Sequence, residues 1–329
     1  MLKQVGIVII GRNEGVRLRD CLMSCCHNDG CIIVYVDSGS TDNSVNVASE
    51  FNIDILELDS SKPFSAARAR NEGLKFIQNK NKETEYIQFI DGDCVLNSSW
   101  IKSSVEYLNN NSRTSIVTGL LTEKNPETSI YNMLCSIEWD TNIGKLTGCG
   151  GIFMARIRDL VMVEGFREDL IAGEEPELCL RLRLKDKNII RIDRKMAVHD
   201  ANMTLFWQWW AREIRSGHAY FECFWIYLDS KTGYRRKEVF SIIFWAVALP
   251  VSVIFLYYYT HYSLFLLALY PYKIIRLSWH YYINNSVKKK IAVLYGASNV
   301  LSKFPKALGV MKYILHRITS KSTPLIEHK

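Results

Sequence analysis

Short apolar runs alternate with amphipathic stretches over the first ninety residues of the chain. Val5 to Ile10 and Cys31 to Val36 are apolar and rich in β-branched residues, without the polar alternation of a half-exposed strand. Runs of this kind are typical of strands buried on both faces of a parallel sheet. Between them, Val16 to Cys26 carries its apolar residues at helical spacing. The pattern predicts a strand–helix–strand unit.

The same alternation continues as far as residue 90. It predicts a helix through Val45 to Ala48, a strand around Ile53 to Leu58, a helix from Ser65 to Gln78 and a strand from Tyr86 to Ile90. We therefore expect an open α/β sheet flanked by helices. Ligands of such sheets gather at the carboxyl ends of the strands. Three polar segments fall at such ends, namely Arg12 to Glu14, Asp37, and Asp91 to Asp93.

The composition changes after Lys237. Val239 to Tyr259 is an uncharged run about long enough to cross a bilayer, and apolar character resumes from Tyr262 to Tyr272. We expect a membrane helix or hairpin over about 239–275, with basic flanks that favour both ends in the cytosol. A buried pair of helices in a soluble protein is the alternative. The expected division is a catalytic domain over 1–230 and a membrane region with a basic tail over 231–329.

Charge and cysteine content indicate the kind of partner and the cellular compartment of the protein. The net charge is +7, and the basic residues gather beside the apolar region, which favours a membrane surface and not nucleic acid as the partner. The nine cysteines are an odd number without the paired spacing of common zinc sites, so we expect free thiols in a reducing compartment. The N-terminus has no cleavable signal pattern, and the catalytic part is expected in the cytosol.

The tripeptide Asp91-Gly92-Asp93 is the first candidate for chemistry. Two carboxylates at a strand end can hold a divalent cation, and Gly92 lets the backbone pass close to a ligand. Asp93 is the predicted metal ligand, whereas Asp91 can reach a ribose or a metal-bound water. Taken alone, the tripeptide is equally typical of a turn after a strand.

The order of motifs from Val5 to about Phe221 resembles glycosyltransferase family 2, which has the GT-A nucleotide-sugar-binding fold. The resemblance rests on three segments of the donor side, which are Val8-Ile9-Ile10-Gly11-Arg12-Asn13-Glu14, Val36-Asp37-Ser38-Gly39-Ser40-Thr41-Asp42, and Ala66-Ala67-Arg68-Ala69-Arg70-Asn71-Glu72-Gly73. It implies the following donor-binding residues: Arg12 and Glu14 in the nucleotide loop, Asp37 at the base, Arg68 at the diphosphate, Asn71 fixing the loop, and Asp91. For Arg70, a solvated position on the helix is the expected alternative to a role in binding.

Two further segments resemble the acceptor side of the family. Gly148-Cys149-Gly150-Gly151-Ile152-Phe153 is similar to its acceptor glycine loop, and Gly173-Glu174-Glu175-Pro176-Glu177-Leu178 is similar to its Glu-Asp-x-Asp-Leu motif. The resemblance implies that Glu175 is the catalytic base, which takes the proton of the acceptor hydroxyl. Glu174 competes for this role, because this chain has glutamate at both aspartate positions. The acidic residues also suit a helix N-terminus without any catalytic role.

By the same resemblance, His199 binds the metal or the diphosphate, and Arg212 on a later helix assists the leaving group. The sequence therefore predicts a metal-dependent inverting glycosyltransferase of hexosyltransferase type that uses Mn²⁺ or Mg²⁺ and a UDP- or GDP-sugar. The expected acceptor is a lipid-linked saccharide in cell-surface polysaccharide synthesis at a bacterial inner membrane, with the catalytic domain in the cytoplasm. The alternatives are a nucleotidyltransferase, which would normally carry a glycine-rich basic loop after its first strand, and a non-catalytic membrane-bound assembly scaffold.

Overall fold

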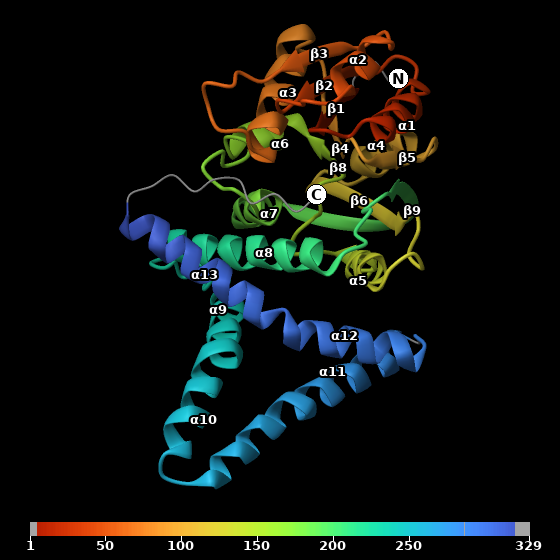
Figure 1. Cartoon of the computed structure of the whole chain (residues 1–329). Helices are drawn as coiled ribbons and strands as arrows, with labels where there is room; N and C mark the ends of the chain where they lie inside the picture. The colour runs from red at the N-terminus through yellow and green to blue at the C-terminus, as the bar shows by residue number, and fades with distance from the viewer. Residues whose placement is uncertain (1–4, 286, 320–329) are drawn as a thin grey trace. The chain divides into compact units, whose positions relative to one another are not determined.

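The computed structural model describes residues 5–285 and 287–319, which form two compact units (Figure 1). The first unit spans Met1–Asn202 and the second Met203–Lys329. The second unit therefore includes α8 (Phe206–Ile226), which the predicted domain over 1–230 counts with the catalytic part. The domain assignment itself stays a prediction.

The first unit is built on one open mixed sheet. The strands run in the order β3-β2-β1-β4-β8-β6-β9-β5, with β7 beside β9. Their bounds are β1 (Val5–Gly11), β2 (Ile32–Asp37), β3 (Asp54–Glu57), β4 (Tyr86–Asp91), β5 (Cys94–Leu96), β6 (Thr114–Glu123), β7 (Gly144–Lys145), β8 (Phe153–Arg156) and β9 (Asn188–His199). The first four strands of this order are parallel, whereas β8 is antiparallel to both β4 and β6. The predicted α/β fold class is confirmed.

Helices cover both faces of this sheet. They are α1 (Val16–Cys26), α2 (Ser44–Ser49), α3 (Ala66–Lys80), α4 (Trp100–Asn110), α5 (Ile130–Trp139), α6 (Ile157–Met162) and α7 (Glu174–Leu184). One hydrophobic core joins the sheet to Leu18 of α1 and Trp100 of α4. A second core joins it to Leu74 of α3 and Leu178 of α7. The strands are apolar along their length because both faces are buried in this way.

The strand register brings the polar segments of the sequence to one edge of the sheet. Strand β1 lies between β2 and β4, with Gly11 paired to Asp37 and Ile10 paired to Asp91. The chain runs outward from β1 through β2 to β3 and then returns to β4 on the other side of β1. A crevice forms at the carboxyl ends of the strands where the strand order reverses in this way. The expected gathering of the loop after β1, Asp37 and Asp91 at carboxyl ends is therefore confirmed.

The second unit is helical. Helix α8 packs against α13 (Lys303–Ile318), and a Cβ atom added at Gly217 or Gly309 would collide with backbone atoms of the opposite helix. Glycine is needed at both positions because the two helix backbones touch. Helix α11 (Leu269–Asn285) packs against α12 (Lys289–Leu301) in the same unit.

Within the described residues, one helix is long and apolar enough to cross a membrane, judged by length and composition. It runs for 22 residues over Arg236–Tyr257 and consists of α9 (Arg236–Ile243), a π-helical turn η2 (Phe244–Ala248) and α10 (Leu249–Tyr257). The π-helical turn ends two residues before Pro250, whose ring and missing N–H disturb a regular α-helix.

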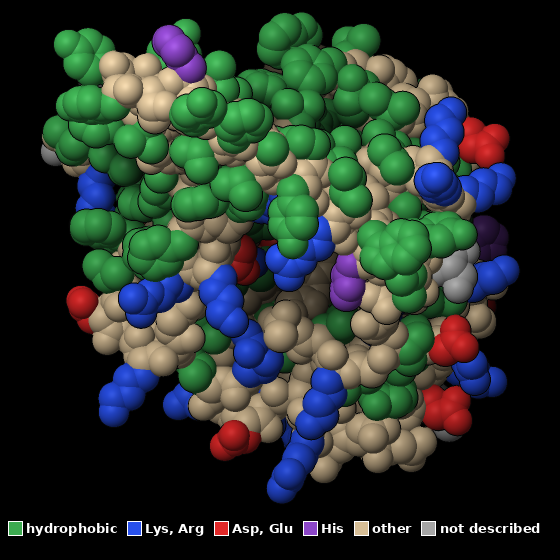
Figure 2. Space-filling model, turned by 90° about the horizontal axis from the view of Figure 1, so that it is seen from below, with side chains coloured by type: hydrophobic (Ala, Val, Ile, Leu, Met, Phe, Trp, Pro, Cys, Tyr) green, Lys and Arg blue, Asp and Glu red, His purple; other side chains and the backbone are tan. Residues whose placement is uncertain are grey.

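This helix is not the buried core helix of the soluble alternative. Only 22% of its apolar window is buried inside the chain, and large side chains such as Ile254 and Phe255 are exposed. The apolar residues that follow form the 3-10 helix η3 (His261–Ala268) and the start of α11. Seen from below, hydrophobic side chains cover a wide area of the surface (Figure 2).

Candidate functional site

The Asp37 carboxylate anchors the loop after β2. It is 1% exposed, and its two oxygens accept hydrogen bonds from the Tyr35 hydroxyl at 2.8 Å and the Ser40 backbone N–H at 2.7 Å. The Ser40 hydroxyl adds a third bond at 2.6 Å. Burial, followed by the Asp37 charge, raises the pKa of Tyr35 above its ordinary value, so this phenol stays a donor. Asp37 thus fixes the loop that the resemblance assigns to the nucleotide base.

The loops after β1 and β2 are tied together by side chains. Asn13 donates its N–H to the Ser40 hydroxyl at 2.9 Å and accepts from the Thr41 N–H at 2.8 Å. The backbone N–H of Glu14 donates to the Ser44 hydroxyl at 3.0 Å. These bonds hold the predicted nucleotide-binding residues of both loops at one edge of the sheet. The other predicted residue of this loop, Arg12, lies over the ring of Phe64, with its guanidinium carbon 5.7 Å from the ring centroid.

Helix α3 carries two of the predicted donor-binding residues, and both make contacts within the protein. Arg68 donates to the backbone carbonyls of Lys62 at 2.9 Å and Asp59 at 2.9 Å, so it braces the loop before the helix. Asn71 donates to the Phe166 carbonyl at 2.8 Å and accepts from the Phe166 N–H at 2.9 Å. Asn71 therefore holds the loop before α7, and the donor-binding roles of both residues stay predictions.

Arg70 joins the donor side of the site to the acceptor side. Its guanidinium lies 2.9 Å from an Asp91 oxygen, 2.8 Å from Glu174 and 3.3 Å from Glu175. Burial opposes its charge, but the carboxylates of Glu175, Asp91 and Glu174 outweigh burial and raise the pKa of Arg70. A permanent cation thus sits among three carboxylates that come from β4 and α7.

The alternative of a solvated Arg70 is wrong. The side chain is 2% exposed, because residue 70 lies on the same helix face as Leu74 and Ile77, which are both buried. The spacing of i, i+4 and i+7 marks one face of a helix and could have indicated this position from the sequence. Burying an arginine is costly unless carboxylates pair with it, and here three of them do.

Glu174 and Glu175 occupy different environments at the start of α7. The helix begins after Gly173, whose φ of 80° lies in the left-handed region that glycine tolerates. Glu174 is 4% exposed and is held by the shorter contact to Arg70, whereas the side chain of Glu175 is 16% exposed. Burial and the neighbouring Glu174 charge raise the pKa of Glu175 to about 7, against the opposing effect of Arg70. Glu175 is thus the carboxylate that can exchange a proton near neutral pH.

The glycine loop before β8 touches the same cluster. A Cβ atom added at Gly151 would lie 2.5 Å from an Asp91 oxygen and 2.7 Å from an Arg70 nitrogen. A side chain there would displace one of them, so the close approach of the loop requires glycine. At Gly150, in contrast, an added Cβ atom meets nothing within 4 Å. The predicted acceptor loop therefore borders the Asp91–Arg70 pair through Gly151.

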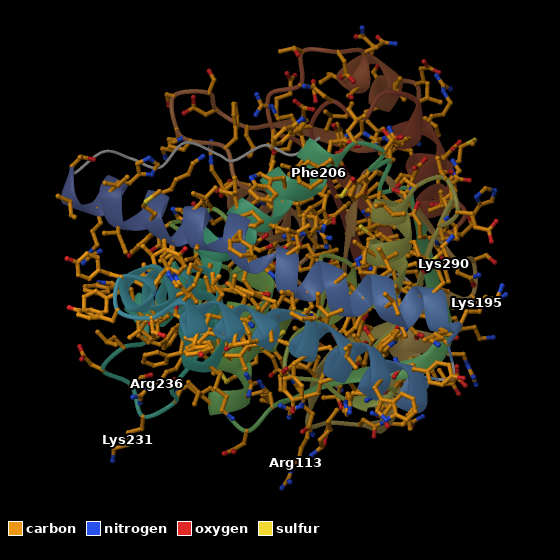
Figure 3. The ribbon with its side chains drawn as sticks, turned by 60° about the horizontal axis from the view of Figure 1, so that its bottom comes forward. Arg113, Lys195, Phe206, Lys231, Arg236 and Lys290 are labelled. Carbon is orange, nitrogen blue, oxygen red and sulfur yellow. The ribbon has the colours of Figure 1, made fainter. Side chains whose placement is uncertain are left out.

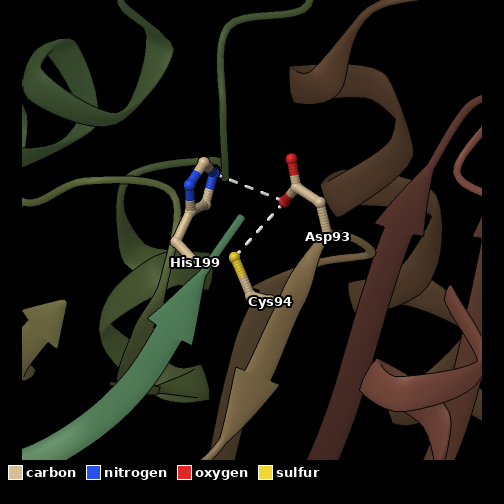
Figure 4. Close-up of side chains that lie close together, drawn as sticks. All are labelled: Asp93, Cys94 and His199. Carbon is tan, nitrogen blue, oxygen red and sulfur yellow. Dashed lines mark hydrogen bonds and ion pairs between the residues drawn. The ribbon is translucent and has the colours of Figure 1, made fainter. Parts of the chain in front are cut away.

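Asp93 lies in the turn just before β5 and faces His199 at the end of the neighbouring strand β9, with Cys94 beside them (Figure 4). The His199 Nε2 atom lies 3.4 Å from an Asp93 oxygen, and the Cys94 sulfur lies 3.3 Å from the same oxygen. The three ligand atoms are within 4.8 Å of one another. A carboxylate and an imidazole at this separation suit a divalent cation. The structure brings together the two residues predicted from the sequence to bind metal.

Two residues that were not identified from the sequence support His199. The register places Glu123 of β6 opposite His199, and a Glu123 oxygen lies 3.9 Å from Nδ1. The Trp139 ring packs edge-on against the imidazole, with 4.5 Å between ring centroids. The buried Nδ1 atom has no hydrogen-bond partner among the described residues. A metal-binding histidine commonly directs its second nitrogen at a carboxylate, so this environment fits a metal ligand.

Arg212 and the tryptophans around it lie on α8 in the second unit. Phe206 contacts the rings of Trp207, Trp209 and Trp210, with centroid distances of 5.1, 5.8 and 5.4 Å. Trp207 is 70% exposed, whereas Trp209 is buried. The predicted role of Arg212 at the leaving group stays a prediction.

Known proteins resemble this chain in the sequence of its N-terminal half and in fold. Residues 6–160 match the model of the family described as glycosyl transferase family 2. The chain is similar in structure to a mannosyltransferase from Pyrobaculum calidifontis, solved in complex with GDP-Man and Mn²⁺, with 14% identity, a TM-score of 0.58, and 94% of this chain and 87% of that chain covered. This likeness shows a shared fold.

A weaker likeness links the chain to glucosyl-3-phosphoglycerate synthase from Mycobacterium tuberculosis, solved with Mn²⁺ and UDP-Glc. The identity is 14%, the TM-score is 0.40, and 60% of this chain and 71% of that chain are covered. No curated protein matches the chain. The family model nonetheless covers both nucleotide-side loops, Arg70 and the Asp91-Gly92-Asp93 tripeptide. Through this N-terminal part, the chain is similar to glycosyl transferase family 2.

Proposed function

We propose that the protein is an inverting glycosyltransferase that moves a sugar from a UDP- or GDP-sugar to a lipid-linked or polysaccharide acceptor. The observation that carries the proposal is the sharing of one guanidinium, that of Arg70, between Asp91 and Glu175. Asp91 belongs to the acidic strand end on the donor side, and Glu175 begins the helix on the acceptor side. The mannosyltransferase solved with GDP-Man and Mn²⁺ supports the donor class.

Transfer proceeds in one displacement in this proposal. Glu175 accepts the proton of the acceptor hydroxyl while that oxygen forms a bond to the anomeric carbon of the donor sugar. The bond from this carbon to the diphosphate breaks on the opposite side, and the nucleoside diphosphate leaves with the electron pair. A base works best when its pKa lies near the working pH, and the pKa of about 7 for Glu175 meets this condition.

Asp93 and His199 are the residues that would hold Mn²⁺ or Mg²⁺. A divalent cation there supplies charge that stabilises the departing diphosphate. Glu123 orients His199 from the other side of the ring, at 3.9 Å. In this proposal, the nucleotide side of the site is formed or supported by Asp37, Arg12, Glu14, Arg68 and Asn71. Asp91 lies nearest to the ribose.

We further propose that the enzyme works at the cytoplasmic face of a bacterial inner membrane and contributes to cell-surface polysaccharide. The support is the exposed apolar helix Arg236–Tyr257 and the basic residues beside it. Ile254→Arg places a charge in this helix, which costs about 2.5–3.5 kcal/mol at a bilayer centre. It should move the protein out of the membrane fraction. Lys102→Glu, on an exposed position of α4, is the control. If both variants were found in the membrane fraction to the same extent, the proposed membrane location would be refuted.

Donor hydrolysis and sugar transfer test the proposed reaction. The purified full chain is supplied in turn with UDP- and GDP-sugars, with and without EDTA, and with a lipid extract as acceptor source. A glycosyltransferase releases nucleoside diphosphate and loses this activity in EDTA. A nucleotidyltransferase would instead release pyrophosphate in a parallel reaction that supplies a nucleoside triphosphate and a sugar phosphate. A scaffold gives no turnover with any donor, and either of these results would refute the proposed reaction.

A further inference from the structure

A cavity of about 480 Å³ opens in the first unit, at the amino-terminal ends of β6 and β9. Four basic side chains line it: Arg113 before β6, Lys145 of β7, Arg183 near the end of α7, and Lys187 before β9. The one acidic residue in its lining is Asp186. Cavities of this volume accommodate small-molecule ligands.

Most of this positive charge is not neutralised inside the protein. Lys187 is paired with Asp159 at 2.8 Å. Within 5–285 and 287–319, the side chains of Arg113, Lys145 and Arg183 make no ion pair or hydrogen bond. The Nε atom of Arg183 is buried and has no partner in the same part of the chain. A buried N–H without a partner costs free energy that a bound acceptor would recover.

The four cations come from three parts of the chain, because Arg183 and Lys187 both lie near the connection from α7 to β9. Basic residues in the last turn of a helix are common, because they complement the helix dipole, and this alone would explain Arg183. It does not explain Arg113 and Lys145, which lie on other segments and line the same cavity. Arg113 projects outward from the protein (Figure 3). Arg183 is half-buried and also lines the cavity.

The cavity is separate from the site described above. Strand β9 begins at Asn188, which lines the cavity, and ends at His199, the predicted metal ligand. A strand rises about 3.3 Å per residue, so the 11 steps from Asn188 to His199 separate the two ends by up to roughly 36 Å. A ligand in the cavity would therefore leave Asp93 and Glu175 accessible to donor and acceptor.

We propose that this cavity is a second binding site, for an anion that carries phosphate groups. Arginine and lysine bind phosphate through charge-assisted hydrogen bonds, and arginine can present two N–H groups to one phosphate. The three unpaired cations against the single carboxylate of Asp186 favour a multiply charged anion such as a diphosphate or a phosphorylated head group. The same phosphate chemistry could come from a soluble molecule or from a lipid.

Calorimetric titration of the detergent-solubilised full chain tests the proposal. Inorganic pyrophosphate is titrated in EDTA, which prevents metal-dependent binding at Asp93. The chain should bind about one pyrophosphate, and both Arg183→Gln and Arg113→Gln should weaken binding about tenfold or more. Lys185→Gln removes the same charge from an exposed neighbour that does not line the cavity, and binding should stay within about twofold.

A second titration distinguishes the two sources of phosphate. Dihexanoyl phosphatidic acid, kept below its micelle concentration, replaces pyrophosphate. Tighter binding of this lipid assigns the site to a head group, and tighter binding of pyrophosphate assigns it to a soluble ligand. If Lys185→Gln weakened binding of the probe as much as the cavity variants do, binding would depend on surface charge in general and not on the cavity. This result would overturn the proposal. Absence of saturable binding of either probe would overturn it as well. Arg113 is exposed, so its variant keeps the test valid if Arg183→Gln fails to fold.

Discussion

The guanidinium of Arg70 lies 3.3 Å from the carboxylate of Glu175, and the same guanidinium binds Asp91 at 2.9 Å. One buried cation therefore fixes the distance between the acidic strand end and the proposed base. It also moderates the repulsion between Glu175 and Glu174, which acts together with burial to raise the pKa of Glu175. Several consequences of this arrangement can be measured.

Replacing Arg70 with Gln should impair both stability and transfer. Three carboxylates would lose their common cation, and removing one partner of a buried ion pair costs about 3–5 kcal/mol. We expect a lower melting temperature at pH 8 and a pH–activity curve displaced to higher pH, because Glu175 would lose the charge that lowers its pKa. Arg158→Gln, at a side chain that is 67% exposed, is the matched control. An unchanged pH–activity curve in Arg70→Gln would show that Arg70 does not influence the pKa of the base.

The raised pKa of Glu175 should make the stability of the folded protein depend on pH. A folded-state pKa of about 7 lies above the ordinary value of 4.5, so the folded protein holds a proton that the unfolded chain releases. The contribution of Glu175 to the free energy of unfolding is therefore fully present below about pH 4.5. It is lost as the pH rises through about 7. Glu175→Gln should melt at a higher temperature than wild type at pH 8, and the difference should shrink at pH 5. Glu72→Gln, at a half-exposed position of α3, is the control and should not reproduce the higher melting temperature at pH 8.

Binding of Mn²⁺ tests the Asp93 and His199 site without any turnover. Electron paramagnetic resonance of free Mn²⁺ should show a binding site in wild type that is lost in Asp93→Ala and His199→Ala. Glu123→Gln removes the charge behind His199, and affinity should fall about 10- to 100-fold. The Asp159→Asn variant, far from these strand ends, should bind as wild type does. Wild-type affinity in Asp93→Ala would place the metal elsewhere.

Two adjacent glycines provide a matched pair. Gly151→Ala puts a methyl group 2.5 Å from an Asp91 oxygen and 2.7 Å from an Arg70 nitrogen, so the pair must separate. Overpacking of this kind costs about 1–3 kcal/mol. Gly150→Ala meets nothing within 4 Å and should leave the melting temperature unchanged. The test is a comparison of the melting temperatures of the two variants. Equal values would mean that the loop moves to accommodate the methyl group without disturbing Asp91.

Much of the sheet could be predicted because its signals are local. Val5 to Ile10 and Tyr86 to Ile90 are apolar runs without alternation, and each became a strand with both faces covered. The polar residues directly after these strands could be placed at one edge, since parallel strands share an edge at their carboxyl ends. Helix Val16–Cys26 followed from its spacing alone.

Contacts between distant segments could not be predicted in the same way. Arg70 and Glu174 are 104 residues apart, and no local pattern indicates that they meet. The position of Glu123 beside His199 depends on the pairing of β6 with β9, which includes register shifts that the sequence does not reveal. The resemblance to the family supplied Glu175 and His199, whereas the burial of Arg70 came from the structure.

Sugar transfer by Glu175→Gln, measured beside wild type with the same UDP- or GDP-sugar, Mn²⁺ and lipid acceptor, tests the central claim most directly. Glutamine keeps the size of the side chain but cannot accept the proton, and general base catalysis contributes about 10²- to 10⁴-fold to rate. We predict metal-dependent transfer by wild type, a loss of at least about a hundredfold in Glu175→Gln with Mn²⁺ binding retained, and near wild-type transfer in Glu72→Gln. Transfer by Glu175→Gln at the wild-type rate would contradict the assignment of Glu175 as the base.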